Sequence, residues 1–181
     1  MSAFILKLLD EAVLPAILVF CAKAGSLILF SRYLGVSFKI EESSIVFSSL
    51  TGFIASNDLS NLFVGIVILL GSGLVLLRLY FFHESHLTPP LLAKLLDSDL
   101  EFAVSTSFNL FHQMVVWLCL GSFTAASLLL QTLFGLGSAY IFFAVFLSLL
   151  GLTVLTILDF EREIKIERSD QPAFLLTESE L

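Results

Sequence analysis

Residues 102–158 contain no Asp, Glu, Lys or Arg, and this long uncharged stretch limits the fold more strongly than any other property of the chain. A helix that crosses the hydrocarbon core of a bilayer needs about 20 apolar residues, so the stretch is long enough for two crossings and a turn. Gly135 and Gly137 place the turn, because glycine permits a sharp reversal of the backbone. We therefore predict an antiparallel pair of membrane-spanning helices at about residues 109–134 and 139–160.

Two more apolar runs, at about residues 12–31 and 62–82, predict two further spans. Asn57, Asp58 and Ser60 precede the second of these runs and are expected to cap its helix. The runs are apolar on all sides, whereas the strands of a membrane barrel alternate apolar and polar residues, so helices are favoured. The prediction is an all-α integral membrane protein with four transmembrane helices in a compact bundle.

The composition agrees with this fold class. Hydrophobic residues make up 57% of the chain and charged residues 14%, whereas a soluble domain carries about 25% charged residues. This balance excludes a disordered chain and an ordinary soluble enzyme. The formal net charge of −7 argues against a nucleic acid as a partner, because binding to phosphates needs a basic surface.

The segments outside the spans are short. Residues 1–168 are expected to form the membrane domain, and residues 169–181 an acidic tail that is flexible. Residues 36–41 alternate like a short strand, and residues 45–55 are apolar but too short to span, which suggests an outer interfacial or re-entrant segment. Residues 88–97 place leucines on one helical face and predict a short amphipathic helix on the cytoplasmic surface.

The basic residues indicate the orientation of the chain. With four spans, both termini and the loop between the second and third spans share one side of the membrane. That side carries Lys7, Arg78, Lys94, Arg162, Lys165 and Arg168. The other side carries Arg32 and Lys39. The positive-inside rule therefore predicts a multi-pass protein with both termini in the cytoplasm.

Lys23 is a charged residue inside the first predicted span. No carboxylate lies within the spans to pair with it, because Glu101 and Asp159 fall at their inner edge. Three interpretations remain open. The side chain snorkels to the outer interface, or it pairs with an acid or a carbonyl of another subunit, or it binds an anion in a cavity. Snorkelling comes first and the subunit contact second.

Arg78 and the histidines lie near the inner ends of the spans. Arg78 is expected to contact headgroups or Glu84, a structural role. His83 and His86 are three residues apart, and with His112 they could converge on a haem or a metal held between two helices. Spacing alone is unspecific, so we predict no metal site and no cofactor, and expect bound lipid.

The third span carries a polar stripe that consists of Asn109, Gln113, Thr124, Ser127 and Gln131. Two pairs of small residues, Ala22 with Ser26 and Gly121 with Ala125, are spaced for close contact between helices. Ordinary packing within the bundle is favoured for both features. The alternative is that the stripe lines a pore.

No sequence pattern typical of a hydrolase, a metalloprotease or a nucleotide-binding site occurs in the chain. We therefore expect a protein that is not an enzyme. A Lys23 without an internal partner and the amphipathic surface segments favour an accessory or structural subunit of a larger membrane assembly. Its partners would be the lipid bilayer and other membrane subunits or copies of itself. The alternatives are a small oligomeric channel or transporter and a haem- or metal-binding membrane redox subunit.

Overall fold

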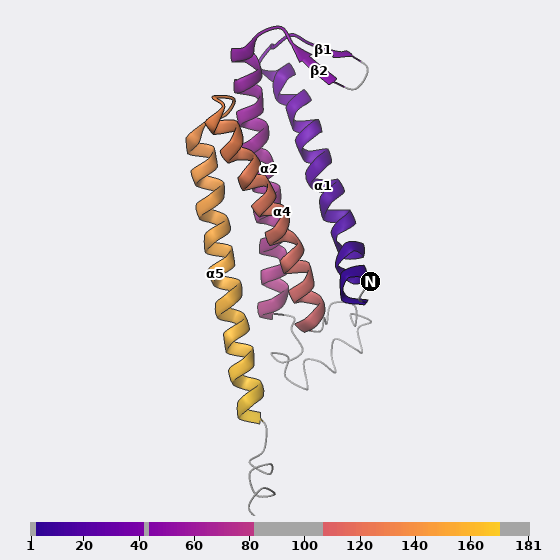
Figure 1. Ribbon diagram of the computed structural model, residues 1–181, viewed down its shortest axis with the longest axis vertical. Coiled ribbons are helices and arrows are strands. Elements are labelled where there is room, and N and C mark those ends of the chain that lie inside the picture. The colour runs from indigo at the N-terminus through magenta and orange to yellow at the C-terminus, as the bar shows by residue number, and fades with distance from the viewer. Residues whose placement is uncertain (1–2, 42–43, 82–106, 171–181) are drawn as a thin grey trace, which may run out of the picture.

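Four long helices make up most of residues 3–41, 44–81 and 107–170, the part of the chain described by a computed structural model (Figure 1). They are α1 (Ala3–Tyr33), α2 (Leu50–Phe81), α4 (Ser107–Leu133) and α5 (Ala139–Asp170). Each of them is long and apolar enough to cross a membrane. The predicted all-α class with four transmembrane helices is therefore confirmed. The amphipathic helix predicted at residues 88–97 and most of the acidic tail lie outside the described residues.

A small β-hairpin connects α1 to α2, and it marks what we call the hairpin end of the bundle (Figure 1). β1 (Phe38–Glu41) pairs in antiparallel register with β2 (Ser44–Phe47). The short strand expected within residues 36–41 is thus present. The interfacial segment predicted at residues 45–55 is wrong as a separate unit, because its first residues form β2 and the others begin α2. The start of α1 and the end of α5 lie at the opposite end, which we call the terminal end.

Helix α2 begins at Leu50, well before the predicted start at residue 62. The hydroxyl oxygen of Ser49 caps it by accepting a backbone amide of the first turn at 3.1 Å. Asn57 and Asp58, which were predicted as caps, therefore lie inside the helix. Polar residues in mid-helix resemble a helix start when they are read along the sequence alone, and here their partners lie on other helices.

The same backbone geometry ends α1 and α4. Gly35 and Gly135 have φ angles of 65° and 69°, which glycine adopts without the strain that a side chain would cause. At the end of α4, the amide of Gly135 donates to the carbonyl of Thr132, and the amide of Leu136 donates to that of Gln131. These bonds satisfy carbonyls that have no partner inside the helix. The turn between the last two spans lies where the two glycines of the sequence predicted it.

Helix α2 contacts all three other helices. A buried apolar cluster joins it to α4 at the terminal end and consists of Val75, Leu79, Leu110 and Met114. Gly71 lets the two helices approach closely, because a Cβ atom there would lie 2.4 Å from the ring of Trp117. The core at the terminal end is therefore apolar and tightly packed.

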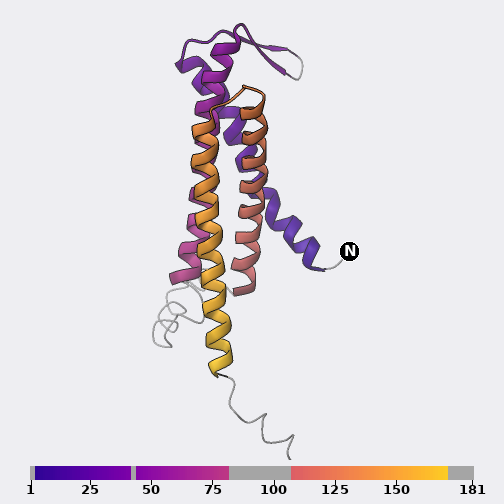
Figure 2. The same cartoon turned by 60° about the vertical axis from the view of Figure 1, so that its left-hand side comes forward.

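Helix α1 separates from the other three helices toward the terminal end (Figure 2). None of its described side chains between Glu11 and Gly25 is buried. In the most apolar stretch of α1 only 6% of the residues are buried, whereas 33% are buried in the corresponding stretch of α2. Pro15 lies inside this part of α1, and a proline in a helix interior removes one backbone hydrogen bond and bends the helix. The compact part of the bundle thus consists of α2, α4, α5 and the hairpin-end half of α1.

Candidate functional site

Polar side chains gather between α1, α2 and α4 in the hairpin-end half of the bundle. We call them the polar cluster: Lys23 and Ser26 of α1, Asn57, Ser60 and Asn61 of α2, and Gln131 of α4. The serines and asparagines are each at most 5% exposed. Polar groups enclosed by membrane-spanning helices must find hydrogen-bond partners within the protein, since hydrocarbon offers none. Every member of the cluster has such a partner.

The half-buried Lys23 ammonium group lies at the centre of the cluster. Its Nζ atom donates to Asn57 Oδ1 at 2.8 Å and to Asn61 Oδ1 at 2.5 Å. The two asparagines are one helical turn apart on α2, so one face of that helix supplies both acceptors. The expectation that Lys23 has no partner in its own chain is therefore wrong. Sequence reasoning sought a carboxylate inside the predicted spans, whereas the partners are neutral amides that can bind a cation through charge-assisted hydrogen bonds.

Gln131 extends the hydrogen bonds to α4. Its Oε1 atom accepts from Asn57 Nδ2 at 2.7 Å and from Asn61 Nδ2 at 2.9 Å. Its own Nε2 atom donates to Ser127 Oγ at 3.1 Å. Asn57 Nδ2 also donates to the carbonyl of Leu136, in the turn between α4 and α5, at 3.1 Å. A continuous network therefore runs from the ammonium group through two amides to α4 and the turn.

Two further contacts tie α2 to its neighbours at this level. The hydroxyls of Ser26 and Ser60 lie 2.8 Å apart, and Ser60 Oγ donates to the carbonyl of Lys23 at 3.1 Å. Asp58 Oδ1 accepts the backbone amide of Ser138, just before α5, at 2.9 Å. Helix α2 thus holds α1 on one side and the beginning of α5 on the other.

A groove of about 310 Å³ opens beside Lys23, between α1, α2 and α4. Its polar lining consists of Lys23, Asn61, Thr124, Ser127 and Gln131, and its apolar lining includes Ala16, Val19, Phe20, Leu120 and Phe123. We call it the Lys23 groove. Its volume is at the lower end of the range of about 300–1,000 Å³ that is usual for pockets that bind small ligands.

The polar stripe predicted on α4 is divided between two places. Thr124, Ser127 and Gln131 line the Lys23 groove, whereas Asn109 and Gln113 lie toward the terminal end and do not line it. Thr124 also donates its hydroxyl to a backbone carbonyl one turn earlier, at 2.9 Å. The stripe is therefore not one continuous polar surface.

The predicted small residues lie at contacts between helices. Ser26, Gly121 and Ala125 are buried, and Ala22 is half-buried. A Cβ atom at Gly121 would lie 2.6 Å from a methyl carbon of Leu149 on α5. Gly121 thus lets α4 and α5 approach closely.

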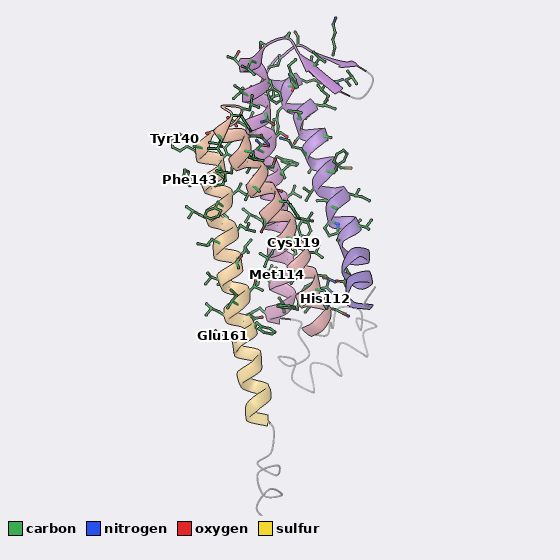
Figure 3. The ribbon with its side chains drawn as sticks, in the orientation of Figure 1. His112, Met114, Cys119, Tyr140, Phe143 and Glu161 are labelled. Atoms are coloured by element: carbon green, nitrogen blue, oxygen red, sulfur yellow. The ribbon has the colours of Figure 1, made fainter. Side chains whose placement is uncertain are left out.

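The remaining candidates form no site within the described residues. His112 is 1% exposed and lies near the start of α4, close to Met114 (Figure 3). His83 and His86 lie outside the described residues. Across the part of the chain that the structure describes, no group of three or more His, Cys, Asp or Glu residues could hold a metal ion. Arg78 is half-buried in the last turn of α2.

Asn57, Ser60 and Asn61 were not among the predicted site residues. The signal was their spacing, because together with Ser56 they occupy positions i, i+1, i+4 and i+5, which share one face of a helix. The uninterrupted apolar run begins only at Leu62, so the helix was predicted to begin after these residues.

The polar cluster and the Lys23 groove are the features from which a function can be argued. They are built from hydrogen bonds between helices distant in sequence, not from a local motif. No match to this chain is found among models of protein families, among curated proteins or among solved structures.

Proposed function

We propose that this chain is a non-enzymatic accessory or structural subunit of a larger membrane assembly, and that the terminal-end half of α1 contacts a helix of another subunit. The observation that carries the proposal is the separation of this half from the bundle (Figure 2). Apolar side chains gain little by leaving lipid for protein, so helices associate in a membrane through close packing. Between Glu11 and Gly25 no described side chain of α1 is buried, so much of the surface of this half remains available for such packing.

Large apolar side chains of this half are exposed. Val13, Leu14, Ile17, Leu18 and Phe20 are each at least 45% exposed. They cover more than one side of the helix, because successive residues are about 100° apart around its axis. A neighbouring helix could therefore pack on either side of α1.

A second apolar surface lies on the other side of the molecule, between α2 and α5. It is a groove of about 760 Å³ whose lining includes Leu70, Leu74, Leu77, Leu155 and Leu158. Side chains of a neighbouring helix fit into grooves of this kind when membrane helices associate. Two separate apolar surfaces suit a subunit that has neighbours on both sides.

The polar cluster changes the basis of the proposal. A Lys23 without a partner no longer supports a companion subunit, because Asn57 and Asn61 supply that partner. In the proposal, the role of Lys23 is to attach the hairpin-end half of α1 to α2. The other half is thereby presented to a neighbouring chain.

The experiment that tests the proposal is a mass measurement. The chain is extracted from its native membrane in mild detergent, and the protein mass of the particle is measured by light scattering. We expect a mass well above the 19.9 kDa of one chain, with a second membrane protein present in fixed ratio. A uniform particle that contains one copy of this chain alone contradicts the proposal, and one that contains several copies alone replaces the companion by self-association.

A matched pair of variants locates the contact. Leu14→Ala with Leu18→Ala shortens one face of α1, and Leu147→Ala with Val154→Ala shortens exposed residues of α5. All four side chains face away from the core, so both variants should fold. Only the α1 variant is expected to release the companion, and equal retention by both variants would remove α1 from the interface.

An oligomeric channel is the alternative function. Thr124, Ser127 and Gln131 favour it, because they line a groove beside a cation. Toward the terminal end, however, the space between α2 and α4 is filled by their apolar cluster. Ion flux through liposomes that contain only this chain would favour the channel over the subunit.

A further inference from the structure

The Lys23 groove changes in polarity along its length. Lys23 and Gln131 lie at its hairpin-end side, whereas Ala16 and Leu120 lie earlier on the same two helices, and so closer to the terminal end. Both helices run in the same direction across the membrane, because each begins at the terminal end (Figure 1). The groove is therefore polar at one end and apolar at the other, along the direction in which lipids of a bilayer align.

The polar end of the groove lies beside the turn between α4 and α5, where those two spans end at the hairpin end. The Lys23 ammonium group bonds to Asn57, and Asn57 bonds to the carbonyl of Leu136 in the turn between two spans. Tyr140, one turn further along, is 88% exposed and points away from the bundle (Figure 3). Exposed tyrosines at the ends of spans are typical of the headgroup layer. A group bound at Lys23 would thus lie close to the lipid phosphates.

The polar end presents hydrogen-bond donors and a positive charge. An ammonium group has three N–H donors, and two of them bond to Asn57 and Asn61 within the described residues. Both acceptors are neutral amides, so these hydrogen bonds leave the charge of Lys23 in place. Asp58, a nearby carboxylate, accepts from the amide of Ser138. The hydroxyl of Ser127 accepts from Gln131 and retains its own hydrogen for donation.

The groove as a whole, its polar end included, is about as long as one leaflet of the hydrocarbon core is thick. The lining extends from Ala16 to Lys23 on α1 and from Leu120 to Gln131 on α4, which corresponds to about 10 and 16 Å at 1.5 Å per residue. Half of the hydrocarbon core of a bilayer is about 15 Å thick. Phe20 and Phe123 are 73% and 76% exposed, so the rings border the lipid phase and leave the groove open from the side.

We propose that the Lys23 groove binds an anionic phospholipid from the leaflet at the hairpin end. The phosphate accepts hydrogen bonds from Lys23 and Ser127, and one acyl chain lies against Phe20 and Phe123. This binding needs no second subunit, so it is measured on the isolated chain and stands or falls separately from the assembly proposed above.

The test compares two lipids on four forms of the protein. The chain is purified in mild detergent and freed of lipid, and phosphatidylglycerol or phosphatidylcholine is added with native mass spectrometry as the readout. Lys23→Gln removes the charge, and Ala16→Trp fills the apolar end without touching the polar cluster. Lys39→Gln is the matched control, because it removes a positive charge from the exposed hairpin.

We expect the unaltered chain and Lys39→Gln to bind phosphatidylglycerol about tenfold more tightly than phosphatidylcholine, because both lipids carry the phosphate but only phosphatidylcholine adds a cationic group, which the charge of Lys23 repels. Lys23→Gln should abolish this preference, and Ala16→Trp should weaken the binding of both lipids. Equal binding of the two lipids by the unaltered chain overturns the proposal, as does an undiminished preference in Lys23→Gln. If Lys23→Gln does not fold, Ala16→Trp tests the proposal instead. Unchanged binding of both lipids by Ala16→Trp would also overturn the proposal.

Two competitors separate the phospholipid from simpler anions. Inorganic phosphate has the same anionic group without an acyl chain, and oleate has a chain that ends in a carboxylate. Neither should displace phosphatidylglycerol at the same concentration. Displacement by oleate would show that the groove prefers a fatty acid, and displacement by phosphate would show that the apolar end contributes nothing, so either result overturns the assignment to a phospholipid.

Discussion

At the scale of single residues, Lys23 shows how a cation is accommodated within a helical bundle without a carboxylate bonded to it. The oxygens of Asn57 and Asn61 accept from the ammonium group, and the amide nitrogens of the same residues donate to Gln131. The side-chain oxygen and the side-chain nitrogen of each asparagine therefore both form hydrogen bonds, and these bonds determine the orientation of the amide. A single change in the network leaves several groups without partners.

Gln131→Leu tests this dependence. It removes the acceptor shared by both asparagine amides, and it leaves Asn61 Nδ2 without the bond to α4. We expect the free energy of unfolding to fall by about 1–3 kcal/mol, since a hydrogen bond between membrane helices contributes about 0.6–1.7 kcal/mol. Unfolding by steric trapping or by detergent titration measures the change. Gln113→Leu, on the same helix but away from the cluster, is the control and should be close to neutral; an equal loss in both would show that the network contributes nothing.

At the scale of the elements, α2 and α4 each contact all three other described helices, and α2 carries the side chains that hold α1 and the turn before α5. Its polar face holds α1 at the hairpin end, and its apolar face packs on α4 at the terminal end. Close contact with α4 depends on Gly71, whose Cα lies against the ring of Trp117. The packing of α2 on α4 is therefore sensitive to one added methyl group.

Gly71→Ala is expected to destabilise the protein, although alanine favours helix more than glycine does. The new Cβ atom would lie 2.4 Å from the ring of Trp117, and overpacking of this kind costs about 1–3 kcal/mol. Gly73→Ala is the control, because no atom lies within 4 Å of its Cβ position, and it should be neutral or stabilising by up to about 1 kcal/mol. Thermal unfolding in detergent separates the two variants. The fluorescence of Trp117, the single tryptophan of the chain, should change only in Gly71→Ala.

At the scale of the whole molecule, the bundle is asymmetric. Its hairpin end is joined by hydrogen bonds among α1, α2, α4 and the turn before α5, whereas at its terminal end α1 stands apart. The two ends are also expected to differ in charge, because the predicted topology places six basic residues on the side of the termini and Arg32 and Lys39 on the other. From this difference in charge, the positive-inside rule predicts that the terminal end faces the cytoplasm.

Labelling of intact cells tests the orientation. We expect tags on both termini to be protected and a cysteine introduced as Lys39→Cys to react with a membrane-impermeant maleimide, because the positive-inside rule retains the more basic side in the cytoplasm. Cys21 and Cys119 are both exposed on the bundle surface, so they are first replaced by serine. Reactive terminal tags together with a protected Lys39→Cys would reverse the orientation.

Much of the fold could be predicted from local properties of the sequence. Apolar runs of spanning length, uncharged over residues 102–158, are compatible with helices in hydrocarbon and with little else. Gly135 sits at a position that needs a positive φ angle, so the turn after α4 was also predictable. These conclusions depend on chain length, hydropathy and backbone sterics. None of them depends on which residues are in contact in the folded protein.

The partners of Lys23 depended on the tertiary structure, and so did the start of α2. The stretch around Asn57 and Asn61 is polar enough to resemble a loop, and it is helical because Lys23 and Gln131, 34 and 70 or more residues away in sequence, satisfy its amides. Hydropathy counts each polar residue as unfavourable in a membrane, whereas a polar residue with partners from two other helices is stable there. Only the packing of distant helices decides which of these two cases applies.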